Sequence, residues 1–456
     1  MARHTENVLV RDGRLERIDD DRSDGVGVRV RSGSAWGFAA TRDLTRAGLR
    51  QALARAMAIA EAQPASAAYP LAPLQALARG HWQGPCDVDP FSISLADKLA
   101  LLMAADEGMR GDPRIVRREV HCQARREQSA FASTDGAACS QSFVHSGGAI
   151  GAVAVDGEEV QMRSFPVAHG GAVAAAGWEH LLGLELVGQA PRVAEEACAL
   201  LTAPACPSGR STIVLHDEQV ALQIHESIGH ALELDRMLLL EASYAGTSWV
   251  TPADLGTLRY GSPALNITAD ATIAGGLGSF GWDDEGVQAT RTPLVVEGQL
   301  RAALADRASA AMIGLSHSGG CARADGFARQ PIVRMTNVSL EAGDAGSMAD
   351  LIADTDEGLY LETNHSWSID DRRLHFQFGT EVAREIRGGE LGRLYRNPSY
   401  AGITPQFWGS LDAVCSADAW HLWGLTNCGK GEPGQVARVS HGAAAARFRD
   451  VEVGVA

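Results

Sequence analysis

Two prolines and a glycine fall within eight residues near the middle of this chain, and they limit how it can fold. Residues 202–209 read TAPACPSG. Proline lacks the amide hydrogen that a helix or a central strand needs, and glycine favours turns, so regular structure is expected to stop here. The chain has 456 residues, and domains usually span about 100–200 residues. The sequence therefore predicts two domains, residues 1–204 and residues 205–456.

The first part of the chain mixes strand and helix patterns. Residues 25–38 are predicted as a hairpin, because apolar residues alternate on both sides of a turn. Apolar residues recur at helical spacing over residues 43–62 and 94–108. The intervening residues 62–90 are rich in proline, glycine and alanine and are predicted as a loop.

Strand patterns then dominate residues 115–156, which are predicted as a meander of four short strands. The four strands are expected over residues 117–126, 128–133, 141–146 and 151–156. Two further helices are expected over residues 177–186 and 192–201. Residues 1–204 are therefore predicted to form an α/β domain.

The second part of the chain carries the strongest helical pattern, over residues 218–239. A short strand is expected before it, over residues 211–215, and short strands with glycine-rich turns follow it to the C-terminus. Residues 205–456 are therefore predicted to be mostly β, with one prominent helix. Together the two parts predict an α+β protein.

Charge and cysteine usage exclude several classes of function. The formal net charge is −16, which disfavours nucleic acids and anionic membrane surfaces, because both need Lys and Arg to replace counterions. There is no apolar run of about 18 residues that would span a membrane, and the highly charged first 24 residues are unlike a secretory signal. The eight cysteines form no C-x-x-C pair and no disulfide framework. The sequence thus predicts a cytoplasmic protein with buried thiols.

A metal-binding pattern lies within the predicted helix 218–239. Residues 225–230 read HESIGH, one residue longer than the H-E-x-x-H pattern of helical zinc sites. Five residues of regular helix would leave the two histidines about 140° apart around the axis. We therefore expect a local widening such as a π-bulge, which Gly229 would ease. His225 and His230 would then bind the metal, and Glu226 would act as the catalytic base.

A catalytic zinc site needs a third protein ligand, and the spacing alone does not identify it. The candidates are residues with suitable side chains elsewhere in the second part of the chain: Glu233, Asp235, His317, Cys321, His365, His375, Cys428 and His441. Glu233, Asp235 and Asp283 are also candidates for carboxylates that orient a ligand histidine. His317 lies in a glycine-rich loop that is a candidate for substrate contact.

Four segments together resemble one known family. They are IHESIGHALELD at 224–235, GSFGWDDEG at 278–286, RMTN at 334–337 and NCGK at 427–430. The set is similar to the motifs of the TldD/PmbA family of zinc metalloproteases, specifically its catalytic TldD side. The resemblance extends over nearly the whole chain.

The resemblance implies one zinc ion per chain, held by His225, His230 and Cys428, with Glu226 as the base. It also implies that a curved, barrel-like β-sheet carries the metal helix. The expected activity is hydrolysis of short or unfolded peptides, by a dimer with a PmbA-like (TldE) subunit or a second copy. Two alternatives remain open at this point: a peptidase or amidase that matures one modified peptide or biosynthetic intermediate, and a non-catalytic partner subunit.

Overall fold

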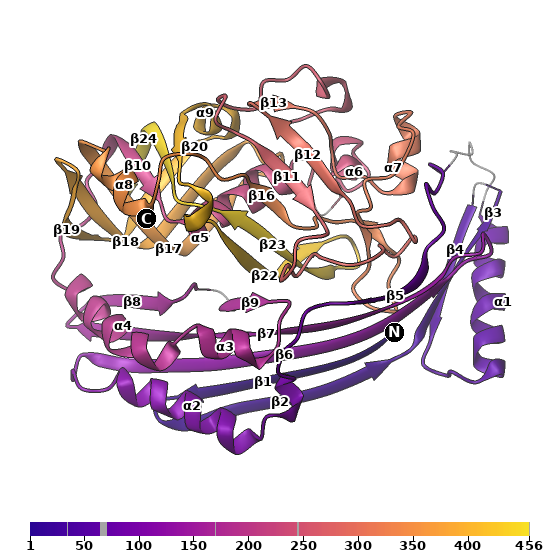
Figure 1. Ribbon diagram of the computed structural model, residues 1–456, viewed down its shortest axis with the longest axis horizontal. Coiled ribbons are helices and arrows are strands. Elements are labelled where there is room, and N and C mark those ends of the chain that lie inside the picture. The colour runs from indigo at the N-terminus through magenta and orange to yellow at the C-terminus, as the bar shows by residue number, and fades with distance from the viewer. Residues whose placement is uncertain (34, 64–70, 169, 244–245, 456) are drawn as a thin grey trace.

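Two seven-stranded sheets organise the molecule, one from each part of the chain (Figure 1). The computed structural model describes the chain except residues 34, 64–70, 169, 244–245 and 456. In the first sheet the strand order is β2–β1–β6–β7–β5, and β8 and β9 also pair with β7. The strands are β1 Ala2–Arg11, β2 Arg14–Asp24, β5 Arg79–Gln83, β6 Ile115–Ala132, β7 Ala138–Asp156, β8 Glu159–Phe165 and β9 Ala172–Ala174.

Strands β6 and β7 form one long antiparallel hairpin, so the prediction of four short strands in this region is wrong. The glycines near residue 147 look like a turn signal in the sequence, but here they permit close packing. A Cβ atom on Gly147 would lie 2.0 Å from the carbonyl oxygen of Ala172, in the β9 strand that pairs with this part of β7. The predicted loop 62–90 is also partly wrong, since it contains β5; its residues 64–70 lie outside the described residues.

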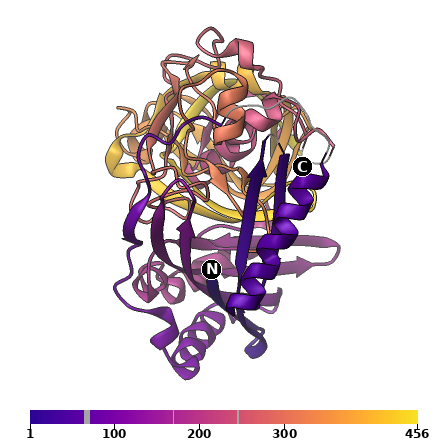
Figure 2. The ribbon, with the colours of Figure 1, turned by 90° about the vertical axis from the view of Figure 1, so that its right-hand side faces the viewer.

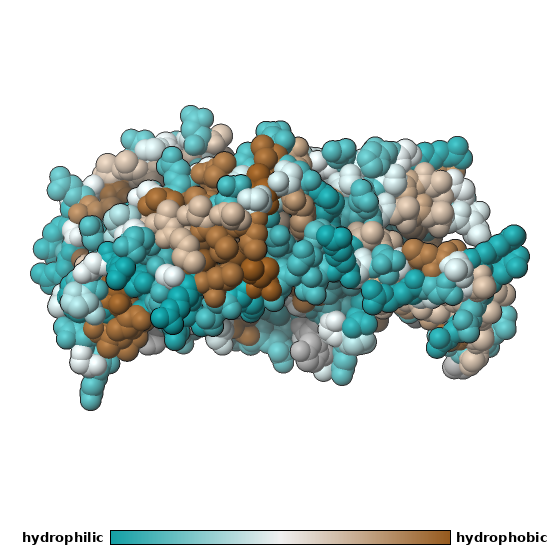
Figure 3. Space-filling view, turned by 90° about the horizontal axis from the view of Figure 1, so that it is seen from below, coloured by the Kyte–Doolittle hydropathy of each residue, from teal (hydrophilic) through white to brown (hydrophobic). Residues whose placement is uncertain are grey.

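Helices cover one face of the first sheet. They are α2 Leu95–Gly108, α3 Trp178–Gly183 and α4 Leu186–Leu200, and their apolar residues share a buried core with β1, β6 and β7. The other side of these helices forms an outer face with apolar areas among polar side chains (Figure 3). Exposed apolar residues on these helices include Leu95, Leu182 and Val187.

A separate hairpin and helix extend one end of the molecule. Strands β3 Val26–Ser32 and β4 Ala35–Thr41 pair as predicted, and helix α1 Arg46–Ala62 packs along them (Figure 2). The helix begins three residues later than predicted. Thr45 is its N-cap, because the Thr45 side chain accepts a hydrogen bond from the Gly48 amide at 3.2 Å.

The second sheet closes into a five-stranded barrel, because β24 pairs with both β20 and β10. Around the barrel the order is β10 Gly209–Leu215, β17 Glu357–Ile369, β18 His375–Arg387, β20 Pro398–Ile403 and β24 Ala446–Val455, with β19 Glu390–Arg396 and β21 Leu411–Val414 attached. This architecture confirms the expected α+β class with a curved, barrel-like sheet.

Two smaller β structures complete this part of the chain. The hairpin of β22 His421–Lys430 and β23 Gln435–Ala443 packs against helix α5 Asp217–Ile224. A four-stranded sheet contains β11 Ile267–Asp270, β12 Arg291–Val296, β13 Gln299–Leu300 and β16 Val338–Leu340. The connections contain three short helices, α7 Arg307–Met312, α8 Met348–Ala353 and α9 Thr404–Gly409. They also contain one pair of short strands, β14 Ala322–Arg323 with β15 Ile332–Val333.

The predicted helix 218–239 is broken into three pieces. Helix α5 is followed by a π-helical turn over His225–Gly229, and α6 Leu234–Met237 starts only after an extended Glu233. The chain extends at Glu233 because the flanking backbone pairs with Leu304: the Leu234 amide donates to the Leu304 carbonyl at 2.9 Å. The expected local widening is confirmed, whereas the expected helix length is wrong.

Candidate metal centre and peptide pocket

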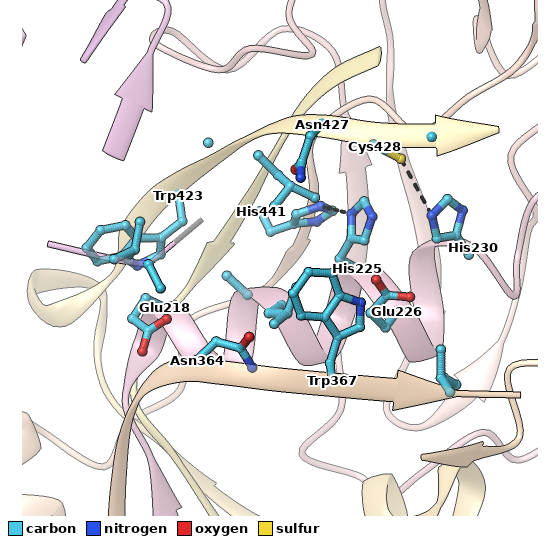
Figure 4. A pocket seen from close by; sticks show the side chains of 18 of the residues that line it. Glu218, His225, Glu226, His230, Asn364, Trp367, Trp423, Asn427, Cys428 and His441 are labelled. Carbon is cyan, nitrogen blue, oxygen red and sulfur yellow. Dashed lines mark hydrogen bonds between the residues drawn. The ribbon is translucent and has the colours of Figure 1, made fainter. Parts of the chain in front are cut away.

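One face of helix α5 and the π-turn forms the floor of a pocket of about 500 Å³ (Figure 4). The helical residues that line it are Glu218, Ala221, Leu222, His225 and Glu226. Their spacing of three, four and seven residues places them on one side of a helix. Strand β17 forms one wall and strand β22 the other, so the pocket is a channel that runs along α5.

The π-turn brings the two predicted histidine ligands together. The His230 amide donates to the His225 carbonyl at 3.1 Å, a bond across five residues that absorbs the extra residue of the motif. The ring centroids of the two histidines are therefore only 4.7 Å apart. Gly229 serves this turn through packing, since a Cβ atom there would lie 2.1 Å from the sulfur of buried Met335.

Cys428 on β22 completes a cluster of three donors. Its sulfur lies 3.5 Å from His230 Nε2, and one ligand atom from each of His225, His230 and Cys428 lies within 4.8 Å of the others. Zinc binds sulfur at about 2.3 Å and imidazole nitrogen at about 2.0 Å, so adjacent S and N corners of a tetrahedron are about 3.6 Å apart. The observed S–N separation fits that geometry.

A chain of hydrogen bonds sets which nitrogen of His225 faces the cluster. His441 Nδ1 lies 2.7 Å from the Val338 carbonyl oxygen, and His441 Nε2 lies 2.8 Å from His225 Nδ1. A carbonyl only accepts, so His441 donates through Nδ1 and must accept at Nε2. His225 therefore donates from Nδ1 and keeps the Nε2 lone pair for a metal. His441 was one of the open candidates for the third ligand. Its hydrogen bond to His225 Nδ1 instead makes it a residue that orients the His225 ring.

A second set of contacts fixes His230 in the same way. Its Nδ1 donates to Glu233 Oε2 at 3.0 Å, and the same oxygen accepts from Arg236 Nε at 2.7 Å. Lys430 lies 3.3 Å from Glu233 and binds the Asp235 carboxylate at 2.7 Å. Glu233 thus contacts His230 on the side away from the pocket, whereas Asp235 binds Lys430 and the Arg236 amide and does not contact a histidine in the described hydrogen bonds.

Burial and neighbouring charge set the protonation of the three donors. Burial lowers the pKa of both His225 and His230 to about 4, so both rings are neutral at pH 7. Burial raises the pKa of the Cys428 thiol, but His230 and the Arg334 guanidinium outweigh it, and the net pKa is below the ordinary value. Two neutral imidazoles and an acidified thiol are the donor set that zinc prefers.

Glu226 points into the pocket beside the donors (Figure 4). Its Oε2 accepts a hydrogen bond from Arg373 Nη1 at 2.6 Å. Arg373 lies in the turn between β17 and β18 and is itself a pocket residue. The sequence analysis did not identify it, because the turn is 147 residues from Glu226 along the chain.

Two of the predicted candidates lie away from this pocket. The Asp283 carboxylate accepts hydrogen bonds from the backbone amides of Glu285, Val287 and Ala322, and so holds a loop together. His317 is exposed, and its Nδ1 lies 2.9 Å from the Ser316 hydroxyl. Neither contacts the three donors.

The donor geometry coincides with a match to a known family over most of the chain. The profile of the PmbA/TldA metallopeptidase C-terminal domain matches residues 208–455. The profiles of the family's domain 1 and central domain match residues 2–60 and 88–203. The chain belongs to the PmbA/TldD metallopeptidase family. This membership confirms the family resemblance seen in the sequence motifs.

Relatives of similar length carry metalloprotease names. A metalloprotease of Methanothermobacter thermautotrophicus is 30% identical and the match covers 99% of this chain and 93% of the relative. A metalloprotease of Synechocystis is 29% identical, with 98% and 92% covered. A TldD homolog of Haemophilus influenzae is 27% identical, with 98% and 90% covered. These names agree with the metallopeptidase family to which the chain belongs.

Solved structures share the PmbA/TldD fold at low sequence identity. A putative modulator of DNA gyrase from Thermotoga maritima superposes with a TM-score of 0.76 at 17% identity, covering 99% of this chain and 94% of that one. TldE from Thermococcus kodakarensis superposes with a TM-score of 0.74 at 13% identity, covering 99% and 95%. Within the part of the chain that the structure describes, every helix is too short or too polar to cross a bilayer.

Proposed function

We propose that this PmbA/TldD member is a zinc peptidase with one zinc ion per chain, bound by His225, His230 and Cys428. The observation that carries the proposal is the meeting of these three donor atoms, all within 4.8 Å of one another, on one side of a pocket. A relative from Saccharolobus solfataricus, 25% identical over 54% of this chain, is named a zinc metalloprotease TldD homolog. That name supports zinc as the metal.

Glu226 is the catalytic base in this proposal. A zinc ion, when bound, lowers the pKa of a coordinated water and polarises the scissile carbonyl. Glu226 would accept a proton from the attacking water and return it to the leaving amine. Arg373 holds the Glu226 carboxylate at 2.6 Å and so positions it. His441 and Glu233 fix the two ligand rings, so little reorganisation is needed when the metal binds.

The channel fits an extended peptide as the substrate. It runs along α5 between β17 and β22, and its lining mixes apolar and polar side chains. Short or unfolded peptides are the substrate class in this proposal. The likeness to TldE supports a dimer with a homologous subunit or with a second copy as the working assembly.

Metal content tests the proposal directly. Purified, untagged protein is expected to contain about one zinc per chain by elemental analysis. Cys428→Ala should lose most of that zinc, because a neutral methyl replaces a thiolate ligand. Cys321→Ala, a change at another buried cysteine outside the pocket, is the matched control and should keep it. Absence of zinc from the unchanged protein, even after zinc is added back, would contradict the proposal.

A further inference from the structure

The channel continues past the metal centre to a buried carboxylate, Glu218. This residue is 6% exposed and lines the channel seven residues before His225, on the same face of α5. One of its oxygens accepts a hydrogen bond from the Thr363 amide. Within the described residues, no Lys, Arg or His nitrogen lies within 4.0 Å of its carboxylate. A buried carboxylate in this position normally requires a cationic partner.

Charged neighbours of Glu218 are already engaged with other groups. His216 pairs with Asp217 at 2.8 Å, and Asp217 also pairs with His421 at 2.6 Å. The Glu362 carboxylate is bound by Arg163. Burial is accordingly the largest influence on Glu218, and it raises the pKa of this carboxyl to about 8. The charge of nearby His216 lowers this pKa, but burial outweighs it, so Glu218 keeps its proton near pH 7 unless a cation enters the channel.

A second unsatisfied group lies beside Glu218 in the same channel (Figure 4). The Asn364 side-chain amide donates to the carbonyls of Ser366 and Gly379, which fixes its orientation. Its Oδ1 is buried and has no hydrogen-bond partner among the described residues. Asn364 is 4% exposed and lines the channel. The end of the channel is therefore lined by a carboxyl group with no cation within 4.0 Å and by an amide whose oxygen lacks a hydrogen-bond donor among the described residues.

We propose that Glu218 and Asn364 bind a primary ammonium group of the peptide substrate. An ammonium group carries three donors and a positive charge, and it accepts no hydrogen bond. Its positive charge would favour the ionised form of Glu218, and its N–H groups would donate to the Glu218 and Asn364 oxygens. The neighbouring Trp423 ring, which also lines the channel, offers an aromatic face to the cation. The inference rests on the proposed peptidase function and specifies the class of peptide that it takes.

The distance along the channel sets which ammonium groups can reach. Seven residues of helix separate Glu218 from His225, a rise of about 10 Å. An extended peptide advances about 3.3 Å per residue. The ammonium group therefore belongs to a residue roughly three positions from the cleaved bond. It is either the free N-terminus of the peptide or the side chain of a lysine at that position.

Peptide binding to the metal-loaded Glu226→Gln protein tests this site without hydrolysis. Three five-residue peptides of otherwise equal sequence are compared by calorimetry: one with a free N-terminus and no lysine, its N-acetylated form, and an acetylated form with lysine three residues before the cleaved bond. A charge-assisted hydrogen bond contributes enough to predict about 10- to 100-fold tighter binding of a peptide that presents an ammonium group. Comparison of the first and third peptides shows whether the bound ammonium group is the free N-terminus or the lysine side chain.

Glu218→Gln in the same background should reduce that preference to less than about threefold, because the amide keeps the Thr363 contact but carries no charge. Glu357→Gln removes an exposed carboxylate from β17 and should keep the full preference. Equal binding of all three peptides to the parent protein would overturn the inference, as would a preference that survives Glu218→Gln. Neither result depends on cleavage, so a failure of the proposed peptidase activity is seen separately, in parallel assays of the unchanged protein.

Discussion

The two ends of the channel differ in how the protein treats its polar groups. At the proposed metal end, each of the two histidines has a hydrogen-bond partner, His441 for His225 and Glu233 for His230, and those partners are bound in turn. At the other end, Glu218 and Asn364 keep oxygens that no described group satisfies. The comparison indicates that the protein fixes the two histidine rings by itself. In our proposal, the substrate supplies the partners that Glu218 and Asn364 lack.

The largest effect is expected at the base. Glu226→Gln should lower kcat by about 10²- to 10⁴-fold, because an amide cannot accept the proton of the attacking water. The zinc content should stay unchanged, since Glu226 is outside the set of ligands. Steady-state kinetics and elemental analysis of the same preparation measure both. Full activity in this variant would remove Glu226 from the mechanism.

The next largest effect is expected on zinc affinity, when the hydrogen bond that orients a ligand histidine is removed. His441→Leu leaves the His225 Nδ1–H without an acceptor and should weaken zinc affinity by about 10- to 100-fold. Competition with a chelator of known affinity gives the value. His317→Leu is the matched control, because His317 is exposed and distant from the site. Equal affinities in the two variants would show that the metal end is less pre-organised than its hydrogen bonds indicate.

The π-turn depends on close packing against Met335, which gives a third prediction. Gly229→Ala places a methyl group 2.1 Å from the Met335 sulfur and should destabilise the metal-free protein by about 2 kcal/mol. Chemical denaturation measures the loss. Met335→Ala combined with Gly229→Ala should cost less than the sum of the two changes, because it removes the clash. Strict additivity would contradict the packing role of Gly229.

The smallest effect is a pH dependence at the opposite end. The folded-state pKa of Glu218 is raised to about 8 from an ordinary 4.5, so the folded protein holds a proton that the unfolded chain releases. Stability is therefore lost as the pH rises from about 4.5 to about 8. Glu218→Gln should flatten this slope by about 1 kcal/mol per pH unit, while the neighbouring His216, Asp217 and Glu362 are left in place. Identical slopes in thermal unfolding of the two metal-free proteins would contradict the burial of an uncompensated carboxyl.

Local features of the site were predictable from sequence. The five-residue spacing of His225 and His230 requires a widened turn in any helix, and the structure has that turn. Glu233 lies three residues from His230, a separation at which helical side chains meet. The prediction of Cys428 as the third ligand rested only on the family resemblance, because its position along the chain did not distinguish it from the seven other candidates.

Contacts between distant segments were not predictable in the same way. His441 and Arg373 meet the metal helix across 216 and 147 residues, through a hairpin and a barrel turn. Asn364 and Glu218 look like ordinary strand and helix residues in the sequence, and only the closed channel reveals their missing partners. The β6–β7 hairpin was missed because Gly147 resembles a turn residue, although its role is to admit a neighbouring backbone.

The order of the site residues along the chain has a consequence during synthesis. His230 and Cys428 are 198 residues apart, and β24, which closes the barrel, follows both. Ribosomes add about 5–20 residues per second, so a growing chain carries the two histidines for roughly 10–40 s before it has the thiolate. A three-ligand site cannot form during that interval. If the proposed site is the catalytic one, the nascent polypeptide would have no complete zinc site until Cys428 has been synthesised.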